Sequence, residues 1–126
     1  LGATSLLTTK DGTIKQSTVI IPTDRARAYA RLLTSFSEML TKALGMQYRS
    51  EDVFPSIFNQ RSIDSYLTGL DYVMLKLLYD KRIKPSMNNR RIQQLAQSII
   101  KENTYQDYIY EANLTVKKSG LNTLLN

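Results

Sequence analysis

The segment Thr18-Val19-Ile20-Ile21-Pro22-Thr23-Asp24 decides the fold, because it takes the chain from a strand into a helix. Its first four residues are all β-branched and favour an extended strand. Pro22 ends that strand because proline has no N–H to donate to a ladder. Thr23 or Asp24 is suited to cap a helix that follows directly. The segment therefore predicts an α+β protein in which strands precede helices.

A turn upstream joins this strand to an earlier one. The residues Lys10-Asp11-Gly12-Thr13 separate two strand-like runs, 1–9 and 14–21. Asp-Gly between such runs is a strong hairpin signal, so two antiparallel strands are expected. A lone hairpin is marginal in water and too small to cover one face of three helices. We therefore expect a larger sheet, completed by an N-terminal segment that this sequence lacks or by another chain.

The first of three expected helices is amphipathic and about twenty residues long, as the apolar spacing indicates. It starts near Thr23 and ends before Gly45, a typical C-terminal glycine. Its apolar face is expected to contain Tyr29, Leu32, Leu33, Phe36, Leu40, Ala43 and Leu44. Its opposite, polar face is expected to contain Arg27, Arg31, Ser35, Glu38 and Lys42.

A structured loop is expected over residues 47–65, which have no hydrophobic period and contain Pro55. Thr68 and Asp71 then have the spacing of a capping box at the start of the second helix. That helix is apolar on most sides, so we expect it to be buried. It is expected to end near Asp80.

The third helix is expected to begin at Ser86 or Asn88 and to carry an apolar stripe. The tail beyond it has a mixed pattern. Within the tail, Tyr108-Ile109-Tyr110 is compatible with a short strand or a helix. Residues 120–126 are expected to fray.

The composition suits one globular domain over residues 1–126 and excludes several kinds of site. Hydrophobic residues make up 42%, and no apolar run is long enough to span a bilayer. The sequence has no Cys and no His. Disulfides, the usual zinc sites and Ser-His-Asp or Cys-His sites are therefore excluded. The net charge of +6 permits contact with nucleic acid, anionic lipid or an acidic partner and does not select among them.

The order of the elements resembles the metzincin zinc peptidases. Metzincins have a helix ending in His-Glu-x-x-His-Ala-Leu-Gly, a third His, a Met-turn and a C-terminal helix. Here the helix ends Glu38-Met39-Leu40-Thr41-Lys42-Ala43-Leu44-Gly45, and Pro55-Ser56-Ile57-Phe58-Asn59 is similar to a Met-turn. The next helix opens Leu67-Thr68-Gly69-Leu70-Asp71 and closes Leu77-Leu78-Tyr79-Asp80, as in matrixins. The resemblance implies a zincin-like fragment, the C-terminal part of a larger domain.

A closer resemblance is to an uncharacterised bacterial family of secreted proteins and predicted lipoproteins. It covers about residues 12 to 100 and depends on Gly12-Thr13-Ile14, on Ser56-Ile57-Phe58-Asn59 and on the segment from Leu75 to Met87. This resemblance implies an extracytoplasmic location: periplasmic, secreted or lipoprotein. It also implies membrane association through a lipid anchor outside this chain.

The resemblance places the three zinc-ligand positions at Glu38, Lys42 and Tyr48, and the general base at Met39. Zinc catalysis needs three protein ligands and an open position for water. The ammonium of Lys42 would instead repel a metal, and Met39 has no proton to exchange. We therefore expect an inactive peptidase homologue with no catalytic residue, no metal and no cofactor.

The three substituted positions are the candidate binding residues of a groove that takes an extended peptide or another protein. For Glu38 and Lys42 the competing interpretation is a solvated salt bridge that adds about 0.2–0.5 kcal/mol to the helix. For Tyr48 it is packing on the loop. Gly45, Phe58 and Asp71 are expected to be structural. They would end the first helix, fill the floor beneath the groove and cap the second helix.

Two other functions stay open. One is a hydrolase that holds a metal with carboxylates such as Glu38. The other is a basic nucleic-acid adaptor, for which the densest cluster is Lys81, Arg82, Lys84, Arg90 and Arg91. No aromatic residues are interleaved with these charges, so we do not expect nucleic acid. The same cluster is compatible with a solvated turn or with contact to anionic lipid. The sequence specifies neither a ligand nor an oligomeric state.

Overall fold

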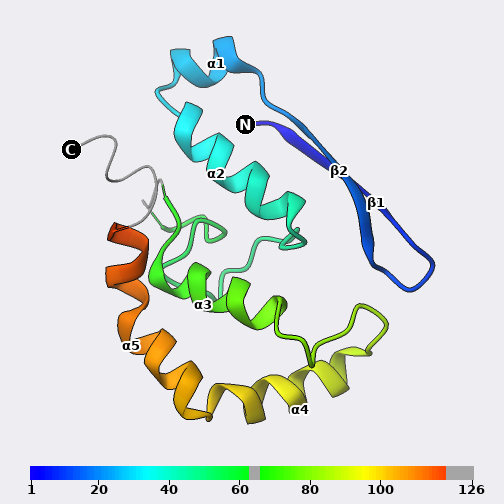
Figure 1. Ribbon diagram of the computed structural model, residues 1–126. Coiled ribbons are helices and arrows are strands. Elements are labelled where there is room, and N and C mark those ends of the chain that lie inside the picture. The colour runs from blue at the N-terminus through cyan, green and yellow to red at the C-terminus, as the bar shows by residue number, and fades with distance from the viewer. Residues whose placement is uncertain (63–65, 119–126) are drawn as a thin grey trace. The chain divides into compact units, whose positions relative to one another are not determined.

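The computed structural model describes residues 1–62 and 66–118 of this α+β protein (Figure 1). A hairpin is followed by helices, as the sequence predicts. The chain divides into two compact units, Leu1–Tyr66 and Leu67–Asn126, where the sequence analysis expects a single domain over 1–126. The fraying expected for residues 120–126 lies outside the described residues.

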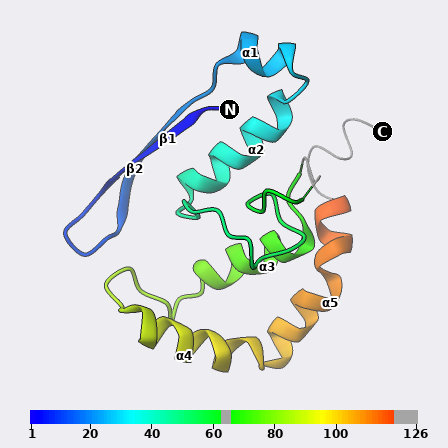
Figure 2. The same cartoon turned by 180° about the vertical axis from the view of Figure 1, so that it is seen from behind.

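The hairpin of the first unit confirms the predicted antiparallel pair. Strand β1 (Ala3–Thr8) pairs with β2 (Ile14–Ile20), and Ala3 lies opposite Ile20. Gly12, in the connecting turn, has φ 89°, a conformation that favours glycine. Figure 2 shows the same hairpin from behind.

Helix α2 (Leu32–Ala43) covers one face of the hairpin. Alternate residues of a strand point to opposite faces, so Thr4 and Ser17 project toward the helix from β1 and β2. The Thr4 hydroxyl donates to the Met39 carbonyl at 3.2 Å, and the Ser17 hydroxyl donates to the Ala43 carbonyl at 2.9 Å. The helix is thus tied to both strands by side-chain hydrogen bonds.

The single long helix expected from Thr23 is wrong, because the segment forms two helices, α1 (Thr23–Ala28) and α2. Ala30 has φ 52°, which stops the helical ladder. The Ala30 N–H donates to Arg27 O, and the Arg31 N–H donates to Ala26 O at 2.7 Å. These two bonds form a Schellman motif, which usually has glycine at the left-handed position. The sequence has alanine there and so hides the break.

The predicted orientation of the amphipathic helix is also wrong. The buried residues of α2 are Ser35, Glu38, Met39 and Thr41. By contrast, Phe36, Leu40 and Leu44 are 44–46% exposed. These three residues follow the i, i+4, i+8 spacing of one helix face. We call them the exposed stripe of α2. Met39 and the Ala43 carbonyl contact the hairpin, whereas Glu38 pairs with Arg49 of the loop that follows the helix.

The loop after α2 folds back on itself. Gly45, with φ 112°, follows the helix, and the Ser50 N–H donates to Phe58 O at 3.2 Å. The Asn59 side-chain amide donates to the carbonyls of Glu51 and Val53 at 3.1 and 3.0 Å. The segment Ser56-Ile57-Phe58-Asn59 is buried throughout. The loop therefore has its own hydrogen-bonded core.

The second unit contains α3 (Gly69–Leu78), α4 (Asn89–Ile100) and α5 (Asn103–Lys118). Helix α3 packs mainly on α5, and α4 contacts α5. A Cβ on Gly69 would clash with the Asn113 side-chain oxygen, so glycine permits the close approach of α3 to α5. With α1, the described residues form five helices, where three were expected.

The helix starts of this unit follow local sequence signals. Thr68 and Asp71 form the predicted capping box. The Asn88 side chain accepts from the Arg91 N–H at 2.9 Å and caps α4. The expectation that α3 is buried is wrong, because its only fully buried residues are Gly69 and Asp71 and its apolar residues stay partly exposed. The tail, where the sequence allowed either a short strand or a helix at Tyr108-Ile109-Tyr110, forms helix α5.

Removal of the Asp71 carboxylate should destabilise the second unit. Its Oδ2 accepts from the Thr68 N–H at 2.9 Å, and the residue is fully buried. We expect Asp71→Ala to lower the free energy of unfolding by about 1–2 kcal/mol, the usual cost of losing a cap. Urea unfolding followed by far-ultraviolet circular dichroism measures the change. Asp107→Ala, at an exposed position of α5, is the control. Equal stability of the two variants would contradict this role of Asp71.

Candidate functional site

A buried carboxylate paired with two cations lies at Glu38, the position that the resemblance to zinc peptidases assigns to a substituted first zinc ligand. Glu38 is only 4% exposed. Its Oε1 lies 3.0 Å from Lys42 Nζ and 2.8 Å from Arg49 Nη2. Glu38 and Lys42 come from α2, and Arg49 comes from the loop that follows it. We call these three residues the Glu38 centre.

The two cations keep Glu38 ionised. Burial raises the pKa of this carboxyl, but hydrogen bonds from Arg49 and Lys42 outweigh that effect and lower the pKa below its ordinary value of 4.5. A negative charge can be buried at modest cost only when opposite charges compensate it. Glu38 therefore stays ionised near neutral pH.

The structure brings together Glu38 and Lys42 but not the third candidate binding residue. Tyr48 is 89% exposed. Among the described residues, no hydrogen bond or ion pair joins it to the Glu38 centre. Its neighbour Arg49 makes that contact instead. The expected i, i+4 salt bridge is present, but the expectation that it is solvated is wrong, because the Glu38 carboxylate is buried.

Two further positions that the resemblance to zinc peptidases singled out, Met39 and Phe58, are buried. Met39 is buried, and its sulfur accepts from the Thr4 hydroxyl at 3.4 Å. Phe58 is also buried, in the loop segment that is hydrogen-bonded to Ser50. Within residues 1–62 and 66–118, no group of three or more Asp or Glu residues could hold a metal ion. The side chains at the three ligand positions, Glu38, Lys42 and Tyr48, do not fit a zinc site.

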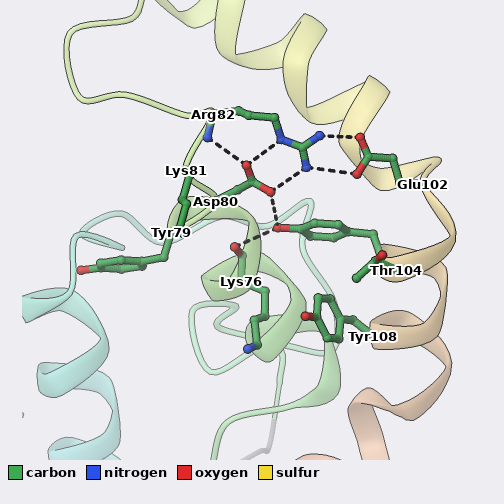
Figure 3. Close-up of a pocket in the computed structure, with 9 residues that line it drawn as sticks. Lys76, Tyr79, Asp80, Lys81, Arg82, Glu102, Thr104 and Tyr108 are labelled. Atoms are coloured by element: carbon green, nitrogen blue, oxygen red, sulfur yellow. Dashed lines mark hydrogen bonds and ion pairs between the residues drawn. The ribbon is translucent and has the colours of Figure 1, made fainter.

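A second polar cluster lies in the other unit, where a hollow of about 340 Å³ opens at the surface (Figure 3). Residues from the end of α3, the following turn and the start of α5 line it. Among them, Lys76 has its ammonium 5.6 Å from the ring centre of Tyr72 and 5.1 Å from that of Tyr108. Such cation–π contacts hold the ammonium over the two rings.

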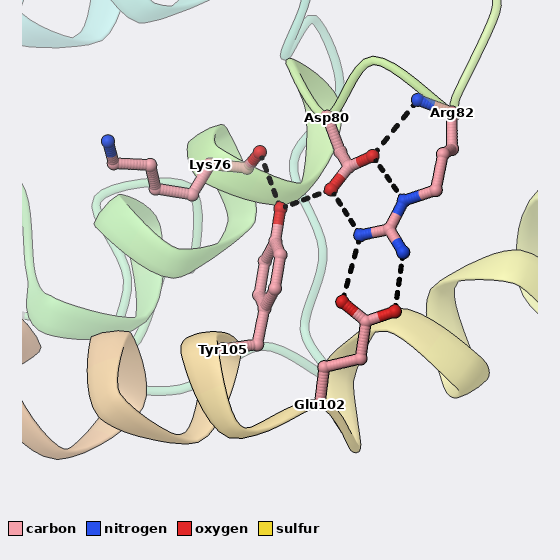
Figure 4. A network of polar contacts seen from close by, with 5 residues as sticks. All are labelled: Lys76, Asp80, Arg82, Glu102 and Tyr105. Carbon is pink, nitrogen blue, oxygen red and sulfur yellow. Dashed lines mark hydrogen bonds and ion pairs between the residues drawn. The ribbon is translucent and has the colours of Figure 1, made fainter.

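The charged part of this cluster is held by one guanidinium (Figure 4). Arg82 Nε and Nη2 donate to the two oxygens of Asp80, each at 2.9 Å. The Arg82 guanidinium also makes a bidentate pair with Glu102, which lies between α4 and α5. The Tyr105 hydroxyl lies 3.1 Å from Asp80 Oδ2 and 3.0 Å from the Lys76 carbonyl. We call Asp80, Arg82, Glu102 and Tyr105 the Arg82 network.

The pKa values of this network follow its hydrogen bonds. Donation from the Arg82 side chain holds the pKa of Asp80 far below its ordinary value. Burial, followed by the hydrogen bond to Asp80, raises the pKa of Tyr105 to about 12. Both groups therefore keep one protonation state over the physiological range. The network joins the ends of three helices and has a structural role.

Sequence reasoning missed Arg49 and the Arg82 network. Arg49 follows Tyr48 directly, but no local rule says that its side chain reaches back to α2. For the Arg82 network, the available signal was the spacing of Asp80 and Arg82, which lie two positions apart. Their partners Glu102 and Tyr105 lie beyond helix α4 in the sequence, and no sequence pattern indicates such a long-range contact.

Comparison with known proteins identifies one family. A family model described as "Protein of unknown function (DUF2927)" matches residues 3–98. The matched range begins in β1 and ends in α4. No curated protein and no solved structure matches the chain.

Neutralisation of Glu38 should lower the free energy of unfolding at neutral pH and make that free energy less dependent on pH in the acid range. The folded-state pKa lies below the ordinary value of 4.5, so this carboxylate stabilises the fold above that pH. The contribution is lost as the pH falls through the folded-state pKa. We expect Glu38→Gln to lower the free energy of unfolding at pH 7 by about 1–3 kcal/mol. The loss should shrink toward pH 3. Glu51→Gln, at an exposed carboxylate in the same loop, is the control. A pH-independent effect of Glu38→Gln would contradict this assignment.

The pKa of Tyr105 should depend on Asp80. We expect Asp80→Asn to lower the Tyr105 pKa from about 12, because an amide does not disfavour the phenolate as a carboxylate does. Titration of tyrosine ring ¹³C signals by NMR measures this pKa, and Tyr105→Phe assigns the resonance. An unchanged Tyr105 pKa in Asp80→Asn would show that burial alone causes the shift.

Proposed function

We propose that this chain, which belongs to the DUF2927 family of proteins of unknown function, is a non-catalytic module that binds an extended peptide or another protein. The buried ion pair of Glu38 with Lys42 and Arg49 carries the proposal. The residue that a zinc peptidase would use as its first ligand is here committed to two cations. The remaining surface offers hydrogen bonds and apolar area, which suit binding.

The chemistry around α2 supports a module without catalysis. A metal ion at Glu38 would have to displace both Lys42 and Arg49, and it would lie beside the two positive charges that it released. The thioether of Met39 supplies no proton for general acid–base catalysis. These residues therefore support a carboxylate-metal hydrolase less well than a non-catalytic module.

The open edges of the hairpin support strand addition by a partner. In the described part of the chain, β1 and β2 pair only with each other. Each strand therefore has one edge whose N–H and C=O groups lack a strand partner, and an extended segment can pair with such an edge. Leu7 and Ile20 are exposed apolar residues on these strands. Main-chain hydrogen bonds would give affinity, and these side chains would give some selectivity.

The exposed stripe of α2 supports the same idea from the helix side. A monomer rarely leaves large apolar residues aligned on one helix face without a covering partner. Additional strands in this sheet would place side chains over α2, which already packs on the hairpin. We propose that such strands come from the partner or from a further segment of a larger zincin-like domain.

The proposed place of action is the cell envelope, in a periplasmic, secreted or lipid-anchored protein. This part of the proposal depends on the resemblance to secreted bacterial proteins. Within the described residues, no helix is both long enough and apolar enough to cross a membrane. In a lipid-anchored protein, the anchor would lie outside this chain.

The test is a screen of extended peptides against the full chain, with binding mapped by amide NMR. We expect amide shifts in β1 or β2, and we expect Tyr48→Ala to weaken the best peptide about tenfold. Tyr110→Ala is the matched control, because Tyr110 is 86% exposed and Tyr48 is 89% exposed. Tyr110 lies on α5, in the other unit.

Two results would contradict the proposal. Zinc-dependent hydrolysis of the screened peptides, lost in Glu38→Gln, would establish a metallohydrolase. Absence of any peptide-induced shift in the hairpin would remove the strand-addition mode.

A further inference from the structure

The segment from Lys81 to Lys101 has an unusual charge distribution. Its 21 residues include no Asp and no Glu. They include six cations: Lys81, Arg82, Lys84, Arg90, Arg91 and Lys101. The whole chain has a net charge of only +6. The net positive charge of the protein therefore comes from this segment, which comprises the turn before α4 and α4 itself. In the rest of the chain, acids and cations are equal in number.

The structure separates one of these cations from the others. Arg82 is held by Asp80 and Glu102, the acids that flank the segment, so its charge is compensated. The side chains of Lys81, Lys84, Arg90 and Arg91 are exposed. Within the described residues they have no carboxylate partner. Four uncompensated charges thus lie within eleven residues, and the acids nearest in sequence are already occupied.

Helix α4 presents its remaining charge away from its packed side. Its buried residue is Ile99, and the partly covered Ile92 lies two turns earlier on the same side. Arg90 and Lys101 are eleven residues apart, so at 3.6 residues per turn they lie nearly in line. Both are exposed. Arg90 and Lys101 therefore lie on the side of α4 opposite the buried Ile99.

We propose that the turn and outer side of α4, residues 81–101, form an electrostatic docking surface for an anionic lipid bilayer. Clusters of four to eight Lys and Arg residues on or beside an amphipathic helix are typical of such surfaces. Ile83 and Met87 lie between the cations and are partly exposed, so they can enter the headgroup region. This proposal is independent of peptide binding at the hairpin.

A nucleic acid is the competing anionic surface, and the segment is poorly suited to it. Single-stranded nucleic acids are bound largely through stacking on aromatic side chains. Residues 81–101 include no Phe, Tyr or Trp. A bilayer attracts clustered cations without any stacking on aromatic rings, and the exposed cations of this turn and helix form such a cluster.

The test is sedimentation of the full chain with vesicles of phosphatidylcholine, alone or with about one-third phosphatidylglycerol. We expect binding to the anionic vesicles only. The binding should fall steeply between about 0.1 and 0.5 M salt, where screening shortens the range of exposed charges. Each surface cation contributes roughly fivefold to the partition constant. The variant Lys81→Gln, Lys84→Gln, Arg90→Gln, Arg91→Gln should therefore lose more than about a hundredfold.

The control removes the same charge from the other unit. The variant Lys10→Gln, Lys15→Gln, Arg25→Gln, Arg27→Gln changes four exposed cations of residues 1–66 and has the same net charge. We expect it to bind anionic vesicles nearly as the unmodified chain does. Circular dichroism confirms that both variants are folded.

Three results would overturn the proposal. The first is that the unmodified chain does not bind anionic vesicles. The second is an equal loss of binding in both variants, which would show that net charge alone is responsible. The third is tighter binding to single-stranded or duplex DNA than to the vesicles at the same salt concentration, which would assign the surface to nucleic acid.

Discussion

The buried carboxylate of Glu38 is the constraint on which the first unit depends. A carboxylate can leave water only if opposite charges and hydrogen bonds replace its hydration. Lys42 supplies one partner from the next turn of α2, and Arg49 supplies the second from the following loop. The loop must therefore fold back on the helix. Ser50, next to Arg49, is hydrogen-bonded to Phe58, so the return also carries the buried segment around Phe58.

This constraint also explains the orientation of α2. The helix buries Ser35, Glu38 and Thr41. Glu38 has its cation partners there, and the Thr41 hydroxyl donates to the Ser37 carbonyl of the same helix at 2.7 Å. Its apolar residues Phe36 and Leu40 then face outward. A helix normally buries its apolar side. Phe36 and Leu40 stay partly exposed, and the outer edges of β1 and β2 have no strand partner among the described residues. Both features support the binding module that we propose.

In the second unit, the cations fall into two groups, those with partners inside the unit and those exposed at its surface. Arg82 uses its planar, five-donor guanidinium to hold two carboxylates from different parts of the chain, a geometry that lysine cannot reproduce. Lys76 is placed over two tyrosine rings. The cations with internal partners stabilise the unit. The other exposed cations of residues 81–101 have no carboxylate partner in the part of the chain that the structure describes, and we propose that they act on another surface.

Local signals in the sequence determined the hairpin, the end of β2 at Pro22, the capping box of Thr68 and Asp71, and the cap at Asn88. Each of these depends on residues within a few positions of one another, so composition and spacing are sufficient. The sequence also determined that His and Cys sites are excluded. It predicted the Glu38–Lys42 pair for the same reason, because the two residues are one helical turn apart.

Only the tertiary structure decided the break at Ala30, the inward polar side of α2, the role of Arg49 and the Arg82 network. Ala30 adopts a conformation for which its residue type provides no signal. The partners of Glu38 and Arg82 lie up to twenty residues away in sequence. Hydrophobic periodicity identifies the two sides of a helix but does not say which side a loop or hairpin will cover. Long-range partners settle that choice, because the free energy of burying a charge depends on what surrounds it.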